Sequence, residues 1–259
     1  MRLHDRVFLL LGGTGGIGQA LAESLLAAGA RVIVTSRNPD ENRRDPLHRV
    51  QLDLAARDLD RQLSQLSEHY PEIDGVIHCA GLNQFASVED LSVQALDDLL
   101  AVNLRSAMLV ARHFVPRFRH TGVGALVFIG STFGSIGYPG YSAYCASKFG
   151  LRGFAEALGR ELADSSLQVL YVAPRATSTP MNSASVNALN QTLGNRMDSP
   201  QAVAAQILRA MRKDQRRRFL GWPERFFVLL NGLLPRLVDK AMFQQLPVIR
   251  RYLNTEIAP

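Results

Sequence analysis

The sequence predicts an α/β protein, with one domain on a doubly wound parallel sheet and an amphipathic helical extension at the C-terminus. Three observations predict this architecture. Short apolar runs alternate with helical patterns up to about residue 173, as in parallel sheets whose strands are buried on both faces. A glycine-rich segment follows the first run, and apolar residues recur at helical spacing over residues 222–253. We therefore expect the domain to span residues 1–221 and the extension to span residues 222–259.

Apolar runs separated by helical patterns predict the first half of the sheet. A first helix over residues 19–28 should end at Gly29, and a second should occupy residues 55–69. The expected strands cover residues 7–11, 31–35, 49–54 and 74–81.

The second half continues the same alternation. Strands are expected at residues 125–129, 168–172 and 216–221, with helices at about 92–119 and 141–163. Ser199-Pro200 marks a further helix start, because proline suits the first helical turn. The polar, small-residue segment 176–187 is expected to be a mobile loop.

Composition narrows the class of protein. Hydrophobic residues make up 47% and charged residues 20% of the 259 residues, as in a globular protein with a substantial core. No signal peptide is recognisable, and Cys79 and Cys145 are too few for a disulfide framework, so a cytoplasmic location is expected. The six His are scattered without metal-ligand spacing, so no metal site is predicted.

The net charge is +6, and the densest basic run covers residues 212–218. Such charge suits nucleic acid, anionic lipid or a phosphorylated cofactor, but it equally suits a solvated face beside a strand. We favour the solvated face and expect no nucleic-acid partner.

The glycine-rich segment predicts a dinucleotide-binding turn. Glycines let the backbone approach a pyrophosphate, and the helix that follows supplies amide donors. The expected contacts are Gly12, Thr14, Gly15, Gly16, Ile17 and Gly18.

The end of the second strand predicts the type of dinucleotide. Ser36 and Arg37 stand where an NAD site usually has an acid for the ribose 2′-hydroxyl. Arg37 can instead pair with a 2′-phosphate, which favours NADP(H) and leaves NAD(H) as the alternative. A solvent-exposed loop arginine would explain the residue equally simply.

Tyr144 and Lys148 form the most specific chemical pattern. They lie four residues apart and share one helical face. With six Tyr and three Lys in the chain, this spacing should arise by chance roughly 0.07 times. A nearby ammonium favours the phenolate, so we expect Lys148 to lower the pKa of Tyr144.

These residues resemble the short-chain dehydrogenase/reductase family over roughly residues 5–220. The glycine spacing matches at Gly12, Gly16 and Gly18, and Asp53-Leu54 resembles the adenine contact of the family. The catalytic tetrad of the family falls on Asn103, Ser131, Tyr144 and Lys148. The resemblance implies a Rossmann-type fold and, commonly, a homodimer or homotetramer.

The resemblance also implies the role of each residue. Tyr144 would be the general acid, Ser131 would polarise the carbonyl, and Lys148 would assist Tyr144 and hold the nicotinamide ribose. Asn103 would hold a water of a proton relay behind Lys148. Further cofactor contacts are expected at Ala80, Gly81, Asn103, Tyr144, Lys148, Pro174, Thr177 and Thr179.

Three segments depart from the family pattern. Leu11 replaces a threonine, His78-Cys79 replaces two asparagines, and Arg175 replaces a glycine. The first two changes remove polar side chains expected to brace the loops. Arg175 would place a cation near the nicotinamide face or swing outward.

The extension carries an apolar stripe opposed by polar residues, and Pro235 and Pro247 are expected to interrupt its helices. We favour docking of this stripe on the domain, as a lid or oligomer contact, over peripheral membrane contact through residues 212–253. The stripe consists of Phe226, Leu230, Leu233, Leu237 and Ala241.

The sequence thus favours an NADPH-dependent oxidoreductase that reduces a lipophilic ketone or oxidises the corresponding alcohol. The alternative is a catalytically silent dinucleotide sensor or scaffold, suggested by Cys79 and Arg175.

Overall fold

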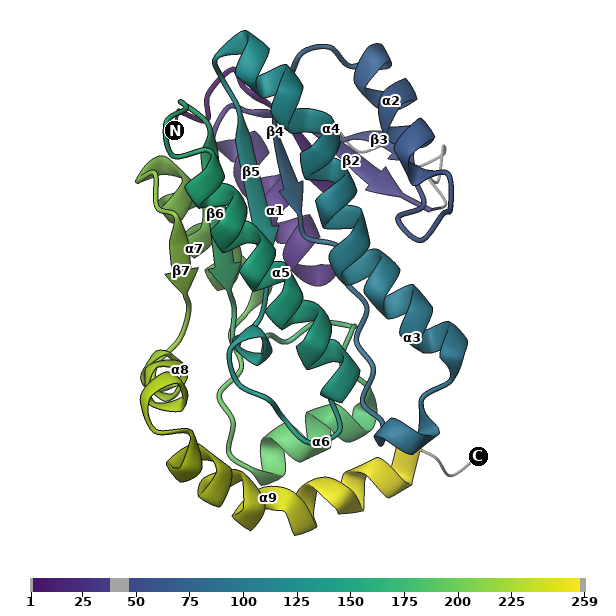
Figure 1. The fold of residues 1–259 in the computed structure, drawn as a ribbon, viewed down its shortest axis with the longest axis vertical. Helices are drawn as coiled ribbons and strands as arrows, with labels where there is room; N and C mark the ends of the chain where they lie inside the picture. Colours follow the sequence, from purple (N-terminus) through teal and green to yellow (C-terminus); the bar gives the residue numbers. More distant parts are fainter. Residues whose placement is uncertain (1, 38–46, 257–259) are drawn as a thin grey trace.

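The computed structural model describes residues 2–37 and 47–256, with side chains up to residue 253. Its centre is a parallel sheet with the strand order β3-β2-β1-β4-β5-β6-β7 (Figure 1). The strands are β1 Val7–Leu11, β2 Arg31–Ser36, β3 His48–Gln51, β4 Ile73–His78, β5 Ala125–Ile129, β6 Gln168–Ala173 and β7 Arg217–Phe219. The strand order reverses between β1 and β4, which is where open α/β sheets bind ligands.

Helices cover both faces of the sheet, as predicted for a doubly wound fold. The helices α1 and α7 pack on one face, and α2, α4 and α5 pack on the other. The main helices are α1 Gly16–Ala27, α2 Leu59–His69, α3 Val93–Leu100, α4 Ser106–Thr121, α5 Ser142–Glu161, α6 Ala184–Thr192, α7 Pro200–Arg212, α8 Glu224–Leu233 and α9 Pro235–Glu256. Short turns are η1 Val88–Asp90, η2 Ala101–Arg105 and η3 Thr132–Gly134.

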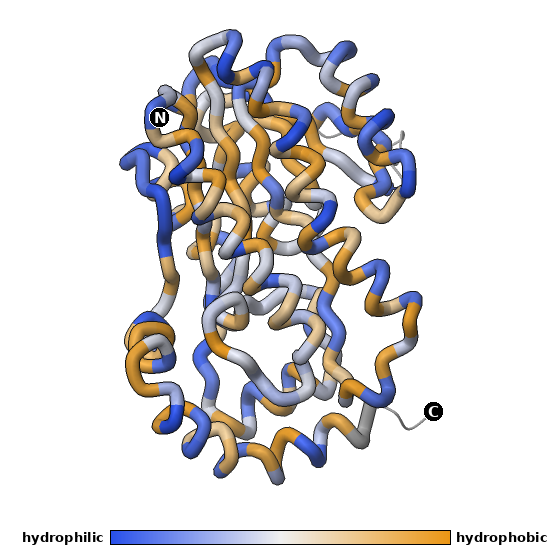
Figure 2. The backbone as a smooth tube through the Cα atoms, in the orientation of Figure 1, coloured by the Kyte–Doolittle hydropathy of each residue, from blue (hydrophilic) through white to orange (hydrophobic). Residues whose placement is uncertain are grey.

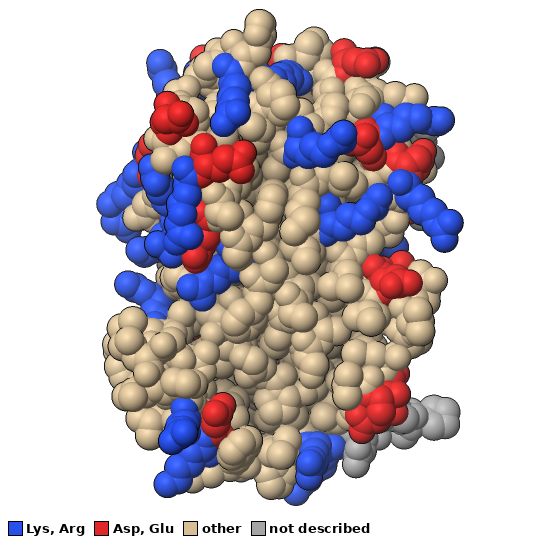
Figure 3. Space-filling view, in the orientation of Figure 1, with Lys and Arg blue, Asp and Glu red and all other residues tan. Residues whose placement is uncertain are grey.

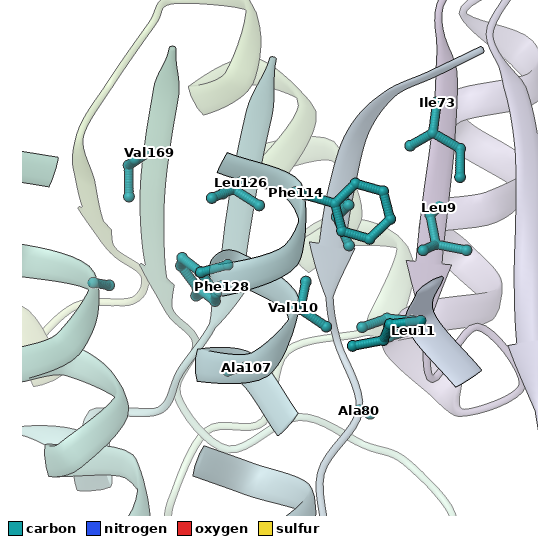
Figure 4. Close-up of a cluster of buried hydrophobic side chains, with 14 of the residues drawn as sticks. Leu9, Leu11, Ile73, Ala80, Ala107, Val110, Phe114, Leu126, Phe128 and Val169 are labelled. Atoms are coloured by element: carbon teal, nitrogen blue, oxygen red, sulfur yellow. The ribbon is translucent and has the colours of Figure 1, made fainter. Parts of the chain in front are cut away.

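Strand β1 shows why the sheet has two cores. Leu9 and Leu11 point into the cluster under α4 and α5, and Phe8 and Leu10 point into the cluster under α1 and α7. Figure 4 shows Leu9 and Leu11 with side chains from β4, β5 and α4. All five residues of β1 are buried, as its apolar run predicts.

A third apolar cluster lies beyond the carboxyl ends of the strands. It joins Tyr141 and Cys145 at the start of α5 to Val186 of α6 and to Ile249 and Leu253 of α9. The inner face of α9 therefore packs directly on the part of the chain that precedes Lys148 (Figure 1).

Several local predictions were wrong. The helix expected at 92–119 is divided by the π-helical turn η2, and α6 begins inside the segment expected to be a mobile loop. Pro235 separates α8 from α9, but α9 continues through Pro247. Pro247 is exposed at the surface of α9, where the backbone can bend and water can hydrogen-bond it. Residues 257–259 of the predicted extension lie outside the described residues.

The apolar stripe of the extension does not dock as predicted. Phe226, Leu233 and Leu237 are 46%, 70% and 55% exposed. Instead, Asn231 turns toward the domain and donates a hydrogen bond from Nδ2 to the Ser135 carbonyl at 3.0 Å. A polar contact thus sets the rotation of α8. Among the described residues, no helix combines the length and hydropathy needed to cross a membrane.

Candidate active site

The turn after β1 leaves no room for a side chain at Gly12 or Gly18. Gly12 has φ +79°, and a Cβ there would lie 2.5 Å from the Cα of Ala80. A Cβ on Gly18 would lie 2.1 Å from the Gly12 carbonyl oxygen. The helix α1 follows with Gly15 as a cap that has no side chain, so its first amides face the cleft without a side-chain acceptor. This cradle fits a pyrophosphate.

A cleft of about 710 Å³ opens above the carboxyl ends of the strands and contains this turn. It brings together all the predicted cofactor contacts except Asn103, together with Ser131. Those residues are Gly12, Thr14, Gly15, Gly16, Ile17, Gly18, Ser36, Arg37, Asp53, Leu54, Ala80, Gly81, Ser131, Tyr144, Lys148, Pro174, Thr177 and Thr179.

Three predicted catalytic side chains meet at one end of the cleft. Lys148 Nζ lies 5.8 Å from the centre of the Tyr144 ring and donates to the Ile129 carbonyl at 3.2 Å. Ser131 follows β5 in an extended conformation, and its side chain lies near enough to Tyr144 to favour a lower pKa of the phenol. The fold therefore places a phenol, a hydroxyl and an ammonium around one small volume.

The pKa values of the pair differ from the prediction. Burial raises the pKa of Tyr144 to about 12, and the nearby Ser131 side chain only partly opposes this effect. Burial also lowers the pKa of Lys148 to about 8. The expected lowering of the Tyr144 pKa by Lys148 is thus wrong for this arrangement, because the loss of hydration outweighs the favourable interactions. At neutral pH Tyr144 holds its proton and can donate it.

Asn103 lies behind the cleft, in the π-helical turn η2, and is fully buried. Its Oδ1 accepts from the Leu82 amide at 2.7 Å, and its Nδ2 donates to the Leu82 carbonyl at 2.9 Å. A Cβ on Gly81 would lie 3.4 Å from both Asn103 Oδ1 and Lys148 Nζ. Asn103 therefore holds in place the loop of Gly81 and Leu82, which lies between Asn103 and Lys148. The relay water remains a prediction.

Sequence reasoning missed Ser147. Its Oγ accepts from Asn103 Nδ2 at 3.0 Å and donates to the Tyr144 carbonyl at 2.7 Å. It therefore joins the η2 turn to the catalytic helix. Its only signal in the sequence was a serine directly before Lys148, since hydroxyls inside helices often bond the preceding turn.

Other interactions replace the polar side chains that the family pattern would place at residues 78 and 79. His78 Nε2 lies 2.7 Å from Ser106 Oγ, and burial, with a smaller effect of Lys148, lowers the pKa of His78 to about 3. The Cys79 amide donates to the Leu11 carbonyl at 3.0 Å, and burial raises the pKa of its thiol to about 12. Both side chains are therefore uncharged at neutral pH.

Arg175 swings away from the catalytic end, the second of the two predicted orientations. Its guanidinium lies 2.6 Å from Asp198 and 3.3 Å from Glu224, and it also donates to the Trp222 carbonyl. The hydrogen bond that Arg175 donates to Asp198 is the largest of the effects that raise the pKa of Arg175. Arg175 therefore ties the loop after β6 to Asp198, which precedes α7, and to the first residue of α8.

The same loop closes over the glycine turn. Pro174 accepts from the Thr132 amide at 2.9 Å, and Thr177 Oγ1 donates to the Arg175 carbonyl at 3.0 Å. The methyl group of Thr179 would lie 2.8 Å from a Cβ on Gly16. The absence of a side chain at Gly16 is therefore what lets this loop approach the start of α1.

The opposite end of the cleft holds the predicted adenosine contacts. Asp53 Oδ1 accepts from the Ala55 amide at 3.0 Å, so its carboxylate shapes the loop after β3. The Arg37 carbonyl accepts from Gln51 Nε2 at 3.1 Å, and the Arg37 side chain is exposed at the cleft. An exposed cation at this end fits an anionic group of the ligand.

The chain matches the short chain dehydrogenase family over residues 6–190 and belongs to that family. It is 28% identical to the 3-ketodihydrosphingosine reductase of Bos taurus over 187 residues, which cover 66% of this chain but only 56% of that protein. It is 32% identical to the 3-oxoacyl-[acyl-carrier-protein] reductase MabA of Mycobacterium tuberculosis, covering 70% of this chain and 72% of that protein.

A solved structure shows the same fold. A short chain dehydrogenase from Burkholderia cenocepacia, in complex with NADP, has a TM-score of 0.81 at 20% identity. The alignment covers 93% of this chain and 99% of that one. The family match and the shared fold therefore agree, and the two relatives are both named reductases.

Proposed function

We propose that the protein reduces a lipophilic ketone with NADPH, or oxidises the corresponding alcohol, using Tyr144 as the general acid. The observation that carries this proposal is the cluster of Ser131, Tyr144 and Lys148 at the end of a cleft that begins in a glycine-rich turn. Such an arrangement supports hydride transfer to a carbonyl beside a proton donor.

The chemistry follows from the positions of three side chains. The nicotinamide coenzyme supplies the hydride when it is bound. Ser131 donates a hydrogen bond to the carbonyl oxygen and so stabilises the charge that develops there. Tyr144, which is protonated at neutral pH, transfers its proton to that oxygen. The Lys148 ammonium, held by the Ile129 carbonyl, stabilises the phenolate that remains.

The remaining site residues are assigned to binding and positioning. The glycine turn from Gly12 to Gly18 would hold the pyrophosphate, and the loop from Pro174 to Thr179 would cover the nicotinamide end. Asp53 and Leu54 would contact the adenine, and Ala80 and Gly81 the central part of the cofactor. Asn103 would keep the Gly81 loop at its distance from Lys148.

Arg37 supports a preference for NADPH over NADH. Arg37→Ala is expected to raise the KM for NADPH roughly tenfold or more and to leave that for NADH nearly unchanged, because only NADPH carries the 2′-phosphate. Steady-state kinetics with both cofactors test this preference. Equal changes in the two KM values would place the 2′-phosphate elsewhere.

Apolar and aromatic residues support a lipophilic substrate. Tyr144 packs beside the third cluster, near Phe133, Tyr138 and Tyr141, and α6 contributes Val186 and Leu189. Two relatives are named as reductases of 3-ketodihydrosphingosine and of a 3-oxoacyl-[acyl-carrier-protein], which agrees with this surface.

A panel of matched ketones tests the proposed function. Long-chain and short-chain 3-oxo compounds are offered with NADPH and with NADH, and cofactor oxidation is followed by absorbance. We expect turnover with NADPH that rises with chain length. Tight NADPH binding without turnover of any ketone would instead favour the silent sensor or scaffold. We also propose a cytoplasmic homodimer or homotetramer, which native mass measurement tests.

A further inference from the structure

Helix α8 and the start of α9 present large apolar side chains to solvent. Trp222 is 68% exposed, Leu229 is 61% exposed, and Phe243 is 70% exposed. We call this surface the apolar face, and it consists of Trp222, Phe226, Phe227, Leu229, Leu233, Leu234, Leu237 and Phe243. Exposed apolar patches of this kind mark sites of interaction.

The outward rotation of α8 is fixed by polar contacts. Asn231 donates to the Ser135 carbonyl, and Glu224 pairs with Arg175. Phe226, Leu229 and Leu233 follow one another at helical spacings of three and four, so they share the opposite side of the helix. The usual amphipathic arrangement is thus inverted in α8, with polar contacts inside and apolar side chains outside. Figure 2 shows that hydrophobic residues predominate along this helix.

Exposed basic side chains lie on the same two helices as the apolar face. Arg225, Arg236, Lys240, Arg250 and Arg251 are all exposed, and Asp239 is the one exposed acid on the described side chains of α9. Residues 212–253 contain ten Lys and Arg against three Asp and Glu, a net +7 in a chain whose total is +6. Figure 3 shows the uncharged surface over α8, with Lys and Arg side chains on α9 below it.

We propose that the apolar face docks on an anionic lipid surface. Charge complementarity selects this occupant, because headgroup phosphates attract these basic side chains while Trp222 and the leucines enter the acyl boundary. A second copy would bring two like-charged surfaces together with few acids to oppose them.

Docking in this way would place a membrane beside the substrate end of the cleft. The inner face of α9 packs through Ile249 and Leu253 on Tyr141 and Cys145, next to Tyr144. The outer face of the same helix carries Lys240 and Arg251. The proposal concerns binding alone and does not depend on which substrate is turned over.

The test is co-sedimentation of the full chain with vesicles of phosphatidylcholine alone or phosphatidylcholine mixed with phosphatidylglycerol. Trp222 is the only tryptophan, so its fluorescence reports insertion directly. We expect binding to the mixed vesicles with a blue shift of emission, and at least roughly tenfold weaker binding to phosphatidylcholine. Equal binding to both vesicles, or no blue shift, would overturn the proposal.

Two variants separate the apolar and basic contributions. Leu229→Gln/Leu233→Gln should abolish the blue shift, whereas the control Val88→Gln/Val93→Gln, exposed elsewhere, should keep it. Arg236→Gln/Lys240→Gln should weaken binding about thirtyfold, whereas Arg57→Gln/Arg119→Gln should not. Circular dichroism checks that each variant is folded. A Leu229/Leu233 variant that lost a dimer but retained vesicle binding would assign the face to a second copy and overturn the proposal.

Discussion

Strand β1 and helix α8 are both mostly apolar, yet β1 is wholly buried whereas α8 has no buried residue. In β1 every residue is in register with a residue of β2 and a residue of β4, and the side chains fill two cores. In α8 the contacts with the domain are polar, through Asn231 and Glu224, and the apolar side chains face outward. Hydropathy alone therefore does not locate the core; the polar contacts of an element decide which side it buries.

Substitutions at the catalytic end of the cleft should have the largest effect on the rate. Lys148→Met is expected to lower kcat/KM for ketone reduction about 10²–10⁴-fold, because the phenolate loses its charge partner. With the lysine present, kcat/KM should fall as pH rises above about 8, since the reactive form carries the ammonium.

Kinetics over a pH range measure both effects of Lys148. Lys213→Met, an exposed lysine at the end of α7, is the matched control and should leave rate and pH profile unchanged. A Lys148→Met enzyme with the normal alkaline fall would show that another group titrates.

A substitution in the glycine turn should have the next largest effect, on NADPH binding. Gly18→Ala is expected to weaken NADPH binding about tenfold to a hundredfold, because its Cβ would meet the Gly12 carbonyl and force the turn apart at a cost of about 1–3 kcal/mol. Fluorescence titration with NADPH measures this loss. Gly153→Ala, where a Cβ meets no atom within 4 Å, should bind normally. Equal affinities for the two variants would contradict the close packing.

Loss of the Arg175 ion pairs, which join α8 to the loop after β6, should have a smaller effect. Arg175→Gln removes the ion pairs to Asp198 and Glu224 and should loosen α8 at a cost of about 1–2 kcal/mol. Hydrogen exchange should rise in residues 222–234 while β1 stays protected. Arg61→Gln, whose pair with Asp58 is exposed, should change neither. Unchanged exchange in α8 would mean that Asn231 alone holds it.

Local sequence patterns predicted most of the fold and the positions of the residues with a chemical role. The buried run of β1, the glycines from Gly12 to Gly18 and the spacing of Tyr144 and Lys148 depend on short-range geometry, which sequence shows directly. All the predicted cofactor contacts other than Asn103 line one cleft for the same reason, since strand ends of a parallel sheet meet at one edge.

Long-range contacts account for what sequence reasoning missed. The turn η2 that carries Asn103, the outward apolar face of α8 and the partners of Arg175 depend on residues distant in the chain, such as Ser135 and Asp198. The pKa of Tyr144 was misjudged because burial, which sequence does not show, outweighs the effect of nearby polar groups.

Tyr144→Phe tests the central claim most directly, with ketone-dependent NADPH oxidation and NADPH binding measured on the same protein. The variant removes the hydroxyl and keeps the ring, so the aromatic contacts with Phe133 and Tyr141 are retained. We predict unchanged NADPH affinity and turnover lowered about 10³-fold. Full turnover by the variant would contradict the assignment of Tyr144 as the proton donor.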